Sequence, residues 1–328
     1  MLILSRNTDS TIRDTPIGIL TRNNGSDPSI VITNSNFENV NNIVLVRQNG
    51  DVLLSGPGHI DLWATGKRYE GSKGKFETGS VQNVPPRPAS LLNGDGKLFV
   101  QSRPQWRDLD AGSFLIATDY NADNSGTGDQ AAAVNAFLRD AAAQGKVAFF
   151  PAGIYRVEST VTIPRGSKVQ GSSWSQIQGA GAYFEDMNNP KVVVQVGEKE
   201  GEVGSVQIVE MIFSTRGPTA GAIVLQWNLH EEYQGSGMFN FPQPSGESLN
   251  LIDLFSSAAM WDSHVRVGGA RGSDLDFDHC PKHGFDKKCI CASLLMHVMP
   301  KASGYFENVW LWLGDQLVLP YSIDESWN

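Results

Sequence analysis

The sequence predicts an all-β protein whose main architecture is a right-handed parallel β-helix, and three observations lead to this fold class. Residues 145–181 contain three short apolar runs, Val147–Phe150, Ile154–Val157 and Val161–Ile163, each with room for one strand. Pro and Gly separate the runs without an Asn-Gly or Asp-Gly dipeptide, which favours corners in a winding chain over hairpins. The composition, with 34 Gly, 16 Pro and only 19% charged residues, is typical of a turn-rich β protein.

One amphipathic helix is expected over Asp129–Gln144, just before this ladder of strands. Thr127 followed three residues later by Gln130 has the spacing of a capping box, and Gly145 is suited to end the helix. The first coil of a solenoid has an open end that another element must cover. We therefore predict that Thr127–Gln144 caps a solenoid that continues after Gly145.

The pattern divides the chain into three parts. Residues 1–60 contain alternating strands with Asn at the turns and no opening motif, which predicts the last coils of a first β-helix. Periodicity is lost among Gly, Ser and Pro over residues 61–110, which predicts a linker. Residues 111–328 should form the start of a second β-helix, interrupted by an inserted loop at His230–Leu249. We expect the chain to lack the earlier coils of the first helix and the later coils of the second.

Charge and hydropathy exclude several classes of partner. The net charge of −9 and the absence of a Lys/Arg run argue against binding to nucleic acid or to an anionic membrane. No apolar stretch is long enough to cross a bilayer. The apolar start Met1–Leu4 is interrupted by Arg6 and Asp9, so no signal peptide is predicted. We expect the protein to bind a neutral partner. We also expect it to be a monomer and to need no cofactor.

Three cysteines lie close together near the C-terminal end. Cys280, Cys289 and Cys291 accompany His279 and His283, a mixture of ligand types that zinc accepts. The spacing lacks a paired CxxC or HxxxH arrangement, and a disulfide that closes the short loop between Cys280 and Cys289 is the simpler interpretation. We predict this disulfide and no metal, with Cys291 as a buried free thiol, and keep zinc as the alternative.

Two groups of carboxylates are candidates for a metal site or a catalytic site. Asp274, Asp276 and Asp278 alternate with apolar residues, which would suit either a calcium site or a strand with its acidic residues outward, and we favour the strand. Glu231 and Glu232 are adjacent, so their side chains point apart and make a poor acid/base pair. Both are expected to be solvated.

Trp310 and Trp312 are two residues apart, so on a strand they face the same side. Two coplanar indoles on an exposed face would form a platform on which sugar rings stack. The alternative, with both rings inside the coil, fits the spacing equally well.

Several motifs resemble known families. The stretch DYNADNSGTGDQAAAVNAFLRDAAAQGKVAFFPAGIYRV is similar to the opening of the pectate-lyase-superfamily β-helix. Taken in order, RPASLLNGDGKLFVQSRPQW, WSQIQGAGAYF, RGPTAGAIVLQWN, MWDSHVRVGGARGSDL and ENVWLWLGD look like glycoside hydrolase family 55. That family consists of exo-β-1,3-glucanases with two tandem β-helices, so the resemblance implies extracellular hydrolysis of laminarin-type β-1,3-glucan with inversion.

The resemblance also implies where the chemistry lies. The family's active site is in the cleft between the two helices, where a carboxylic acid protonates the leaving oxygen and a water attacks from the opposite face. Trp312 matches a position that lines this cleft. The family's catalytic residues fall in coils that this chain is expected to lack, so this chain alone should have little or no activity. If it is active, Glu307, Asp315 and Glu231 are the first carboxylates to mutate.

Two further interpretations remain open. One is a non-catalytic β-helix that binds glucan or serves a structural role. The other is a pectate-lyase-type enzyme, which would need calcium-binding carboxylates and basic residues over an acidic polymer. The net charge of −9 argues against this last possibility.

Overall fold

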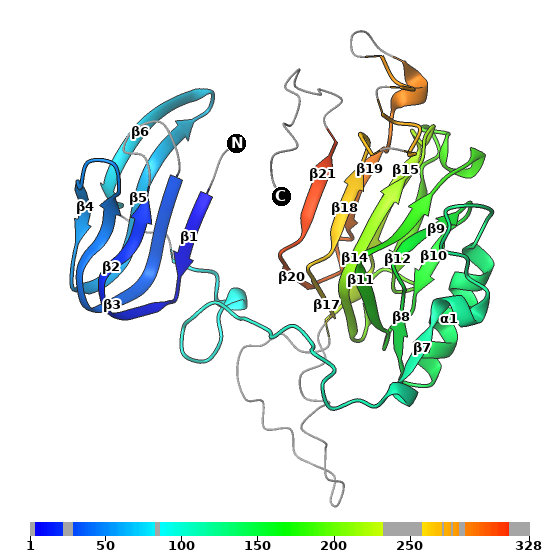
Figure 1. Cartoon of the computed structure of the whole chain (residues 1–328), viewed down its shortest axis with the longest axis horizontal. Helices are drawn as coiled ribbons and strands as arrows, with labels where there is room; N and C mark the ends of the chain where they lie inside the picture. Colours follow the sequence, from blue (N-terminus) through cyan, green and yellow to red (C-terminus); the bar gives the residue numbers. More distant parts are fainter. Residues whose placement is uncertain are drawn as a thin grey trace, which may run out of the picture. The chain divides into compact units, whose positions relative to one another are not determined.

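The computed structural model contains two compact units, one running from Met1 to Val100 and the other beginning at Gln101 (Figure 1). Strands dominate both units. The structure describes residues 4–21, 29–82, 86–231, 258–270, 272–276, 278–281 and 286–314. Among these residues, no helix combines the length and the hydropathy that a bilayer crossing requires.

The first unit is a six-stranded sheet around its longest strand, β3. Its strands are β1 (Leu4–Thr8), β2 (Thr11–Thr21), β3 (Ser29–Val46), β4 (Val52–Ser55), β5 (Gly58–Glu70) and β6 (Lys73–Ser80). β1 and β2 pair with β3 in parallel. β4 and β5 pair with β3 antiparallel, and β6 pairs antiparallel with β5. Ile30, Ile32, Phe37 and Trp63 form part of its buried core.

The prediction of a linker over residues 61–110 is wrong for its first third. β5 and β6 occupy most of residues 61–80 and form a hairpin around Gly71, whose φ of +61° suits glycine. β6 has almost no buried side chain, so backbone pairing rather than apolar burial holds it in the sheet. A strand of this kind has no hydrophobic alternation, which is why the sequence pattern did not reveal it.

The second unit is built from parallel strands. Its strands are β7 (Phe114–Ile116), β8 (Val147–Phe149), β9 (Gly153–Val157), β10 (Val161–Ile163), β11 (Lys168–Gly179), β12 (Lys191–Val196), β13 (Glu202–Val203), β14 (Val206–Thr215), β15 (Ala222–Trp227), β16 (Leu229–His230), β17 (Ala258–Trp261), β18 (His264–Val267), β19 (Leu294–Val298), β20 (Tyr305–Glu307) and β21 (Trp310–Leu313). Every strand pair among the described residues of this unit is parallel. The corners predicted after Phe150 and Ile163 therefore do not reverse the chain.

The chain of the second unit passes back and forth between two sheets. β10, β12, β15 and β19 form a four-stranded sheet, and a nine-stranded sheet contains β7, β8, β9, β11, β14, β17, β18, β20 and β21. A large apolar core lies between the sheets, and the strands of the unit run in a shared direction (Figure 1). Ile177, Phe213 and Val265 stand side by side in neighbouring strands, and all three are fully buried. Side chains that alternate with these three therefore face outward.

The predicted helix is present as α1 (Ala131–Ala143). Short 3-10 turns complete the described helical structure: η1 (Ala89–Leu91), η2 (Ala111–Ser113), η3 (Ala117–Tyr120), η4 (Ala182–Phe184) and η6 (Lys287–Cys289). α1 buries Val134, Phe137 and Leu138 in the core and contacts β8 of the nine-stranded sheet and β10, the edge strand of the four-stranded sheet (Figure 1).

The capping box predicted at Thr127 is wrong. The Thr127 hydroxyl contacts Asp123 and Ser125 instead of the helix. Asp129 Oδ1 accepts the backbone N–H of Ala131 at 3.0 Å and thereby satisfies one of the free donors of the first turn. An aspartate two residues further on competes better for this role than a threonine because its carboxylate is charged. Gly145, with a φ of +63°, ends the helix as expected.

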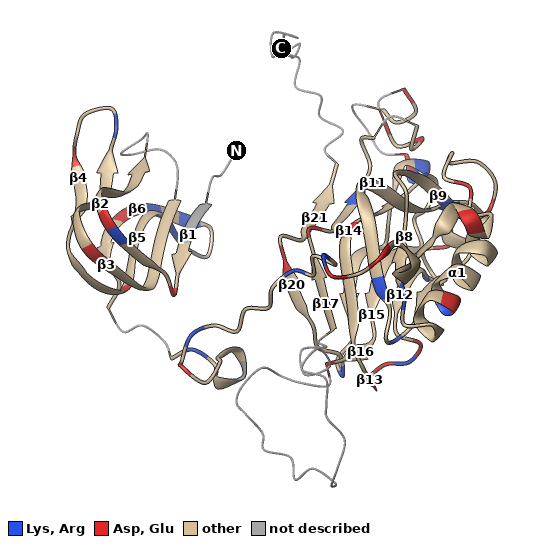
Figure 2. Cartoon of the chain, turned by 60° about the horizontal axis from the view of Figure 1, so that its bottom comes forward, with Lys and Arg blue, Asp and Glu red and all other residues tan. Residues whose placement is uncertain are grey.

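Acidic and basic residues are interspersed on both units, as Figure 2 shows in red and blue. Among the residues coloured there, both signs of charge occur on each unit.

Candidate functional site

The candidate site is the outward face of β18 and β21, two neighbouring parallel strands of the nine-stranded sheet. Their register places His264 beside Trp310 and Arg266 beside Trp312. These four side chains share one face because residues two apart on a strand point the same way. Val265, between them on β18, points into the core and is fully buried.

The register of β21 against β18 decides between the alternatives left open by the spacing of the two tryptophans. Leu311 and Leu313 pair with the buried Val265 and Val267, so the tryptophans between them face outward, and the placement of both rings inside the coil is wrong. Trp310 is 57% exposed and Trp312 is 46% exposed. The expectation of coplanar indoles is also wrong, because the two rings are tilted by 57° with centroids 6.1 Å apart. Each ring has its own polar neighbour on β18.

The neighbours on β18 are a histidine and an arginine. The His264 ring lies 5.4 Å from that of Trp310, and the Arg266 guanidinium carbon is 5.1 Å from the centre of the Trp312 ring. The second arrangement is a cation–π contact. His264 Nδ1 accepts the backbone N–H of Trp310 at 3.3 Å, so the proton of the neutral ring resides on Nε2.

This face combines two aromatic rings with two hydrogen-bond donors. Indole rings stack on the apolar faces of sugars, while the imidazole Nε2–H and the guanidinium can donate to hydroxyl groups. The four side chains include no carboxylate, so they offer no acid for glycoside cleavage. The sequence analysis did not identify His264 and Arg266 as site residues. They become neighbours of the two tryptophans only when β18 is aligned with β21, and that alignment is known only from the structure.

A chain of polar contacts follows the corner that precedes these strands. Glu210, Asp262 and Asn308 all have positive φ, between 48° and 57°, where β14, β17 and β20 end or bend. Asn308 Nδ2 donates to Asp262 Oδ1 at 2.5 Å. Arg103 donates to Glu210 Oε1 at 2.5 Å and to Asp262 Oδ2 at 2.8 Å. Each corner carboxylate is therefore already paired.

Glu307, one of the three candidate carboxylates for catalysis, lies exposed at the end of β20. The hydroxyl of Tyr305 donates to Glu307 Oε2. Burial, followed by this hydrogen bond, raises the pKa of Tyr305 to about 12. The phenol therefore stays protonated and keeps its hydrogen bond to Glu307 at neutral pH. Asp315 lies outside the described residues.

The expectation that Glu231 is solvated is wrong. Its side chain is only 8% exposed, and burial raises its pKa to about 7. Its backbone N–H donates to Ser303 Oγ at 2.9 Å, which holds the residue against the turn before β20. Oε1 is buried without a hydrogen-bond partner in the described part of the chain. The sequence did not reveal this because burial here comes from a contact between residues 72 positions apart. Glu232 lies outside the described residues.

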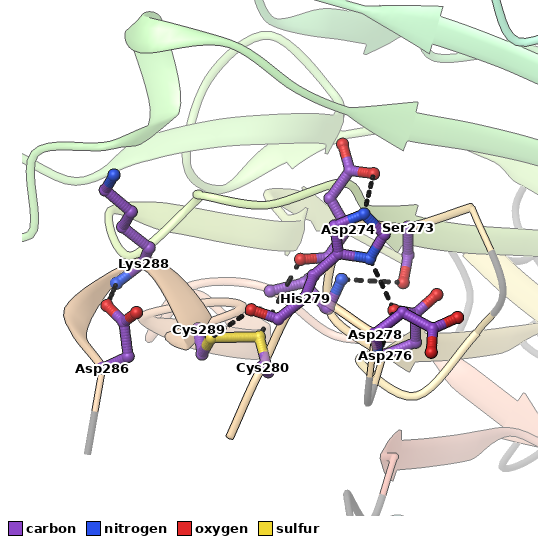
Figure 3. Close-up of a disulfide and its surroundings, with 10 residues drawn as sticks. Ser273, Asp274, Asp276, Asp278, His279, Cys280, Asp286, Lys288 and Cys289 are labelled. Atoms are coloured by element: carbon purple, nitrogen blue, oxygen red, sulfur yellow. Dashed lines mark hydrogen bonds and ion pairs between the residues drawn. A yellow bond between two sulfur atoms is a disulfide. The ribbon is translucent and has the colours of Figure 1, made fainter.

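The acidic segment at Asp274 forms turns, so the predicted strand is wrong (Figure 3). Leu275 is buried as the alternation implied, but Asp274 has a φ of +56°. Asp274 pairs with Arg216 Nε at 2.7 Å, and Asp276 Oδ1 lies 2.6 Å from His279 Nδ1. The hydrogen bond to His279 lowers the pKa of Asp276. Local contacts of this kind favour a turn over a strand.

A disulfide joins Cys280 and Cys289 beside these turns, with the two Cα atoms 5.7 Å apart (Figure 3). Cys291 carries a free thiol that is half buried. Burial raises the pKa of this thiol, so it is a poor nucleophile in the folded state. His283 lies outside the described residues.

We expect thiol counting on protein purified without reductant to find one free cysteine after denaturation. The native protein should react more slowly than the denatured protein, because Cys291 is shielded. Reduction before denaturation is the control and should give three thiols. Three free thiols without reduction, or one bound zinc per chain, would contradict the pairing.

Comparison with known proteins places the second unit in a recognisable context. Residues 114–251 match the family model described as "Rhamnogalacturonase A/epimerase, pectate lyase-like". The chain is 36% identical over 306 residues to the "Non-secreted LysM effector LysM19" of Penicillium expansum, covering 90% of this chain and 23% of that protein.

Two glucanases match over the same extent of the chain. The "Glucan 1,3-beta-glucosidase" of Cochliobolus carbonum is 36% identical over 301 residues, covering 90% of this chain and 35% of that enzyme. The "Glucan endo-1,3-beta-glucosidase BGN13.1" of Trichoderma harzianum is 33% identical over 303 residues, covering 90% and 36% respectively. The chain belongs to the glycoside hydrolase family 55-like proteins. It spans between about a fifth and about a third of the length of the curated relatives it matches.

Proposed function

We propose that this chain is the glucan-binding part of a β-1,3-glucanase-like protein, and that the outward face of β18 and β21 contacts the polysaccharide. The observation that carries the proposal is the pair of exposed indoles at Trp310 and Trp312, each flanked by a hydrogen-bond donor from β18. Two relatives whose printed names are glucan glucosidases match about 90% of the chain, which supports β-1,3-glucan as the ligand.

We further propose that the second unit is a right-handed parallel β-helix capped by α1. The parallel pairing and the passage of the chain between two sheets around one core support this architecture. The position of α1 beside β8 and β10, at the first coil, supports the capping role. The match to a pectate-lyase-like family model agrees with the same fold.

The hydrolytic groups belong, in this proposal, to parts of the protein outside these 328 residues. Inverting hydrolysis needs a free acid and a second carboxylate roughly 6.5–9.5 Å away to activate water. The carboxylates of Glu210 and Asp262 are paired with Arg103, and Glu307 is engaged by Tyr305. Glu231 has an oxygen without a hydrogen-bond partner and is therefore the carboxyl within the described residues that most needs testing by mutation. The chain covers only 35% of the Cochliobolus enzyme, which leaves ample sequence for the catalytic groups.

A second candidate is a non-catalytic glucan-binding protein. The Penicillium relatives named as effectors carry no hydrolase in their printed names, which favours this reading for part of the family. Their names also say "Non-secreted", whereas a disulfide is typical of oxidising compartments such as the cell exterior. We propose an extracellular location on the strength of the disulfide.

The glucan proposal is tested by Trp312→Ala in a laminarin-binding titration. Loss of a stacking indole should weaken binding about tenfold, which corresponds to about 1.4 kcal/mol. Trp312→Phe should retain most of the affinity because an aromatic face remains. Tyr183→Ala, which removes another exposed ring of the same unit, is the matched control and should bind normally.

Two results would count against the proposal. Wild-type protein that does not retain laminarin would refute glucan binding, and equal binding by Trp312→Ala would remove this face from the site. Glucose release from laminarin by the 328-residue chain would instead show that the acid lies within it. Glu307, Asp315 and Glu231 are then the first carboxylates to replace.

A further inference from the structure

We propose that Trp174 is a second sugar-stacking residue, which extends the binding face of β18 and β21 across the sheet to the bulge of β11. This inference rests on the proposed function, because it assumes that the protein binds a β-glucan. It assigns a separate subsite for the same neutral polysaccharide chain.

Trp174 lies on a wide bulge in β11. Gln170 pairs with Val209 of β14 and Ser175 pairs with Met211, so residues 171–174 all lie opposite Glu210 alone. Bulges of this kind re-aim a side chain and are frequent beside functional sites. The bulge also contains Ser173 in the left-handed region, with a φ of +55°, which is unfavourable for a residue other than glycine.

The bulge is anchored rather than loose. The backbone N–H of Ser172 donates to Ser175 Oγ at 2.8 Å, and the fully buried Ser175 hydroxyl donates to the carbonyl of Phe150 at 2.6 Å. At Gly171 the backbone lies so close to β14 that a Cβ would fall 2.1 Å from the Glu210 carbonyl oxygen. These contacts fix the direction in which the next side chains project.

The side chain that this bulge projects is 64% exposed, more than any other tryptophan among the described residues. A large aromatic ring that stays in water lacks the roughly 1.5–3 kcal/mol of stabilisation that its burial would provide. Positive φ also occurs at the following corners, at Glu210, Asp262 and Asn308, so the backbone conformation belongs to the fold, whereas the exposed indole is particular to Trp174. A flat apolar ring is the surface on which a sugar stacks.

The surroundings of the bulge favour a neutral sugar. Gln170, at its start, accepts from the Trp106 indole N–H at 3.1 Å and donates to Glu210 Oε2 at 3.1 Å. Arg103 pairs with Glu210 and with Asp262. Two carboxylates against one guanidinium leave this corner with a formal charge of −1. This charge would repel an acidic polysaccharide, whereas it would not repel a neutral glucan.

The subsite lies on the same sheet as the first one. Gln176 of β11, Ile212 of β14, His264 of β18 and Trp310 of β21 stand in one row across the strands. Three strand spacings separate β11 from β21, or roughly 14 Å. A disaccharide is too short to cover this distance, whereas an oligosaccharide of several sugars covers it. The dependence of affinity on the length of the oligosaccharide therefore distinguishes this subsite from the first one.

The test compares Trp174→Ala with wild type by calorimetric titration with laminaribiose and with laminarihexaose. We expect Trp174→Ala to weaken hexaose binding about five- to tenfold, or about 1–1.4 kcal/mol, and to leave biose binding within about twofold. Trp174→Phe should restore most of the hexaose affinity. Tyr183→Ala is the control for loss of an exposed ring, and unchanged thermal unfolding of each variant excludes misfolding.

The possible failures are distinguishable. If Trp312→Ala weakens hexaose binding and Trp174→Ala does not, the second subsite is refuted while the proposed function stands. If wild-type protein binds neither laminarin nor the hexaose, both are refuted. If Trp174 is needed for binding polygalacturonate instead, the assignment to a neutral glucan is wrong.

Discussion

Replacing Phe150 with alanine should lower the free energy of unfolding of the second unit by about 3–5 kcal/mol. Phe150 is fully buried where the first strands meet α1. Its ring makes edge-on contacts with Phe137 of α1 and with Tyr155 of β9, each with centroids 5.1 Å apart. Removing it leaves a cavity between the helix and the sheet, and it also frees the aromatic contact that fixes the helix against the first coil.

Urea unfolding followed by tryptophan fluorescence measures this change. Trp63 is the only tryptophan before residue 101, so the signal reports mainly on the second unit. Phe150→Leu is the matched control and should cost less than about 1.5 kcal/mol, because it preserves most of the volume. A loss below about 1 kcal/mol for Phe150→Ala would show that the helix does not depend on this contact.

Replacing Glu231 with glutamine should stabilise the protein at alkaline pH and leave it almost unchanged at acidic pH. Burial raises the pKa of Glu231 from 4.5 to about 7. Below the unfolded pKa the carboxyl is protonated in both states, so its contribution to stability is fully present. As the pH rises towards the folded pKa, only the unfolded state ionises and stability is lost. The loss is complete above about pH 7 and amounts to about 3 kcal/mol.

The measurement is the urea midpoint of wild type and Glu231→Gln at about pH 4 and about pH 8. The variant should be more stable than wild type only at the higher pH, since its amide cannot ionise. Glu185→Gln, an exposed glutamate of the same unit, is the control and should follow wild type at both values. A variant that loses stability equally at both values would indicate a hydrogen bond that only the carboxyl can make.

The strands and corners around Gly145 were predictable because the core is continuous there. Val157, Val161 and Ile163 each follow a polar residue and are fully buried. Burial of one face imposes the periodicity of two that the sequence displays. β6, the second strand of the hairpin with β5, has no buried side chain, and its pairing is therefore invisible in the pattern.

The candidate site was predictable only in part. The spacing of Trp310 and Trp312 placed both on one face, but only the packed strand showed that this face is outward. His264 and Arg266 join them through the register of β18 against β21, which pairs residues 46 positions apart. No local pattern specifies such a pairing, because it depends on how many residues the intervening coil contains.

The sequence by itself determined the β class, the helix that precedes the strands, the corners and the family of this protein. The strands, the helix and the corners follow from local propensity and from the hydrophobic period that a buried face requires, whereas the family follows from the resemblance of an ordered series of motifs. Tertiary structure alone decided the burial of Glu231, the tilt of the two indoles, the pairing of Arg103 with the corner carboxylates and the exposure of Trp174. Each of these depends on contacts between distant residues, whose desolvation and geometry arise only when separate coils pack against one another.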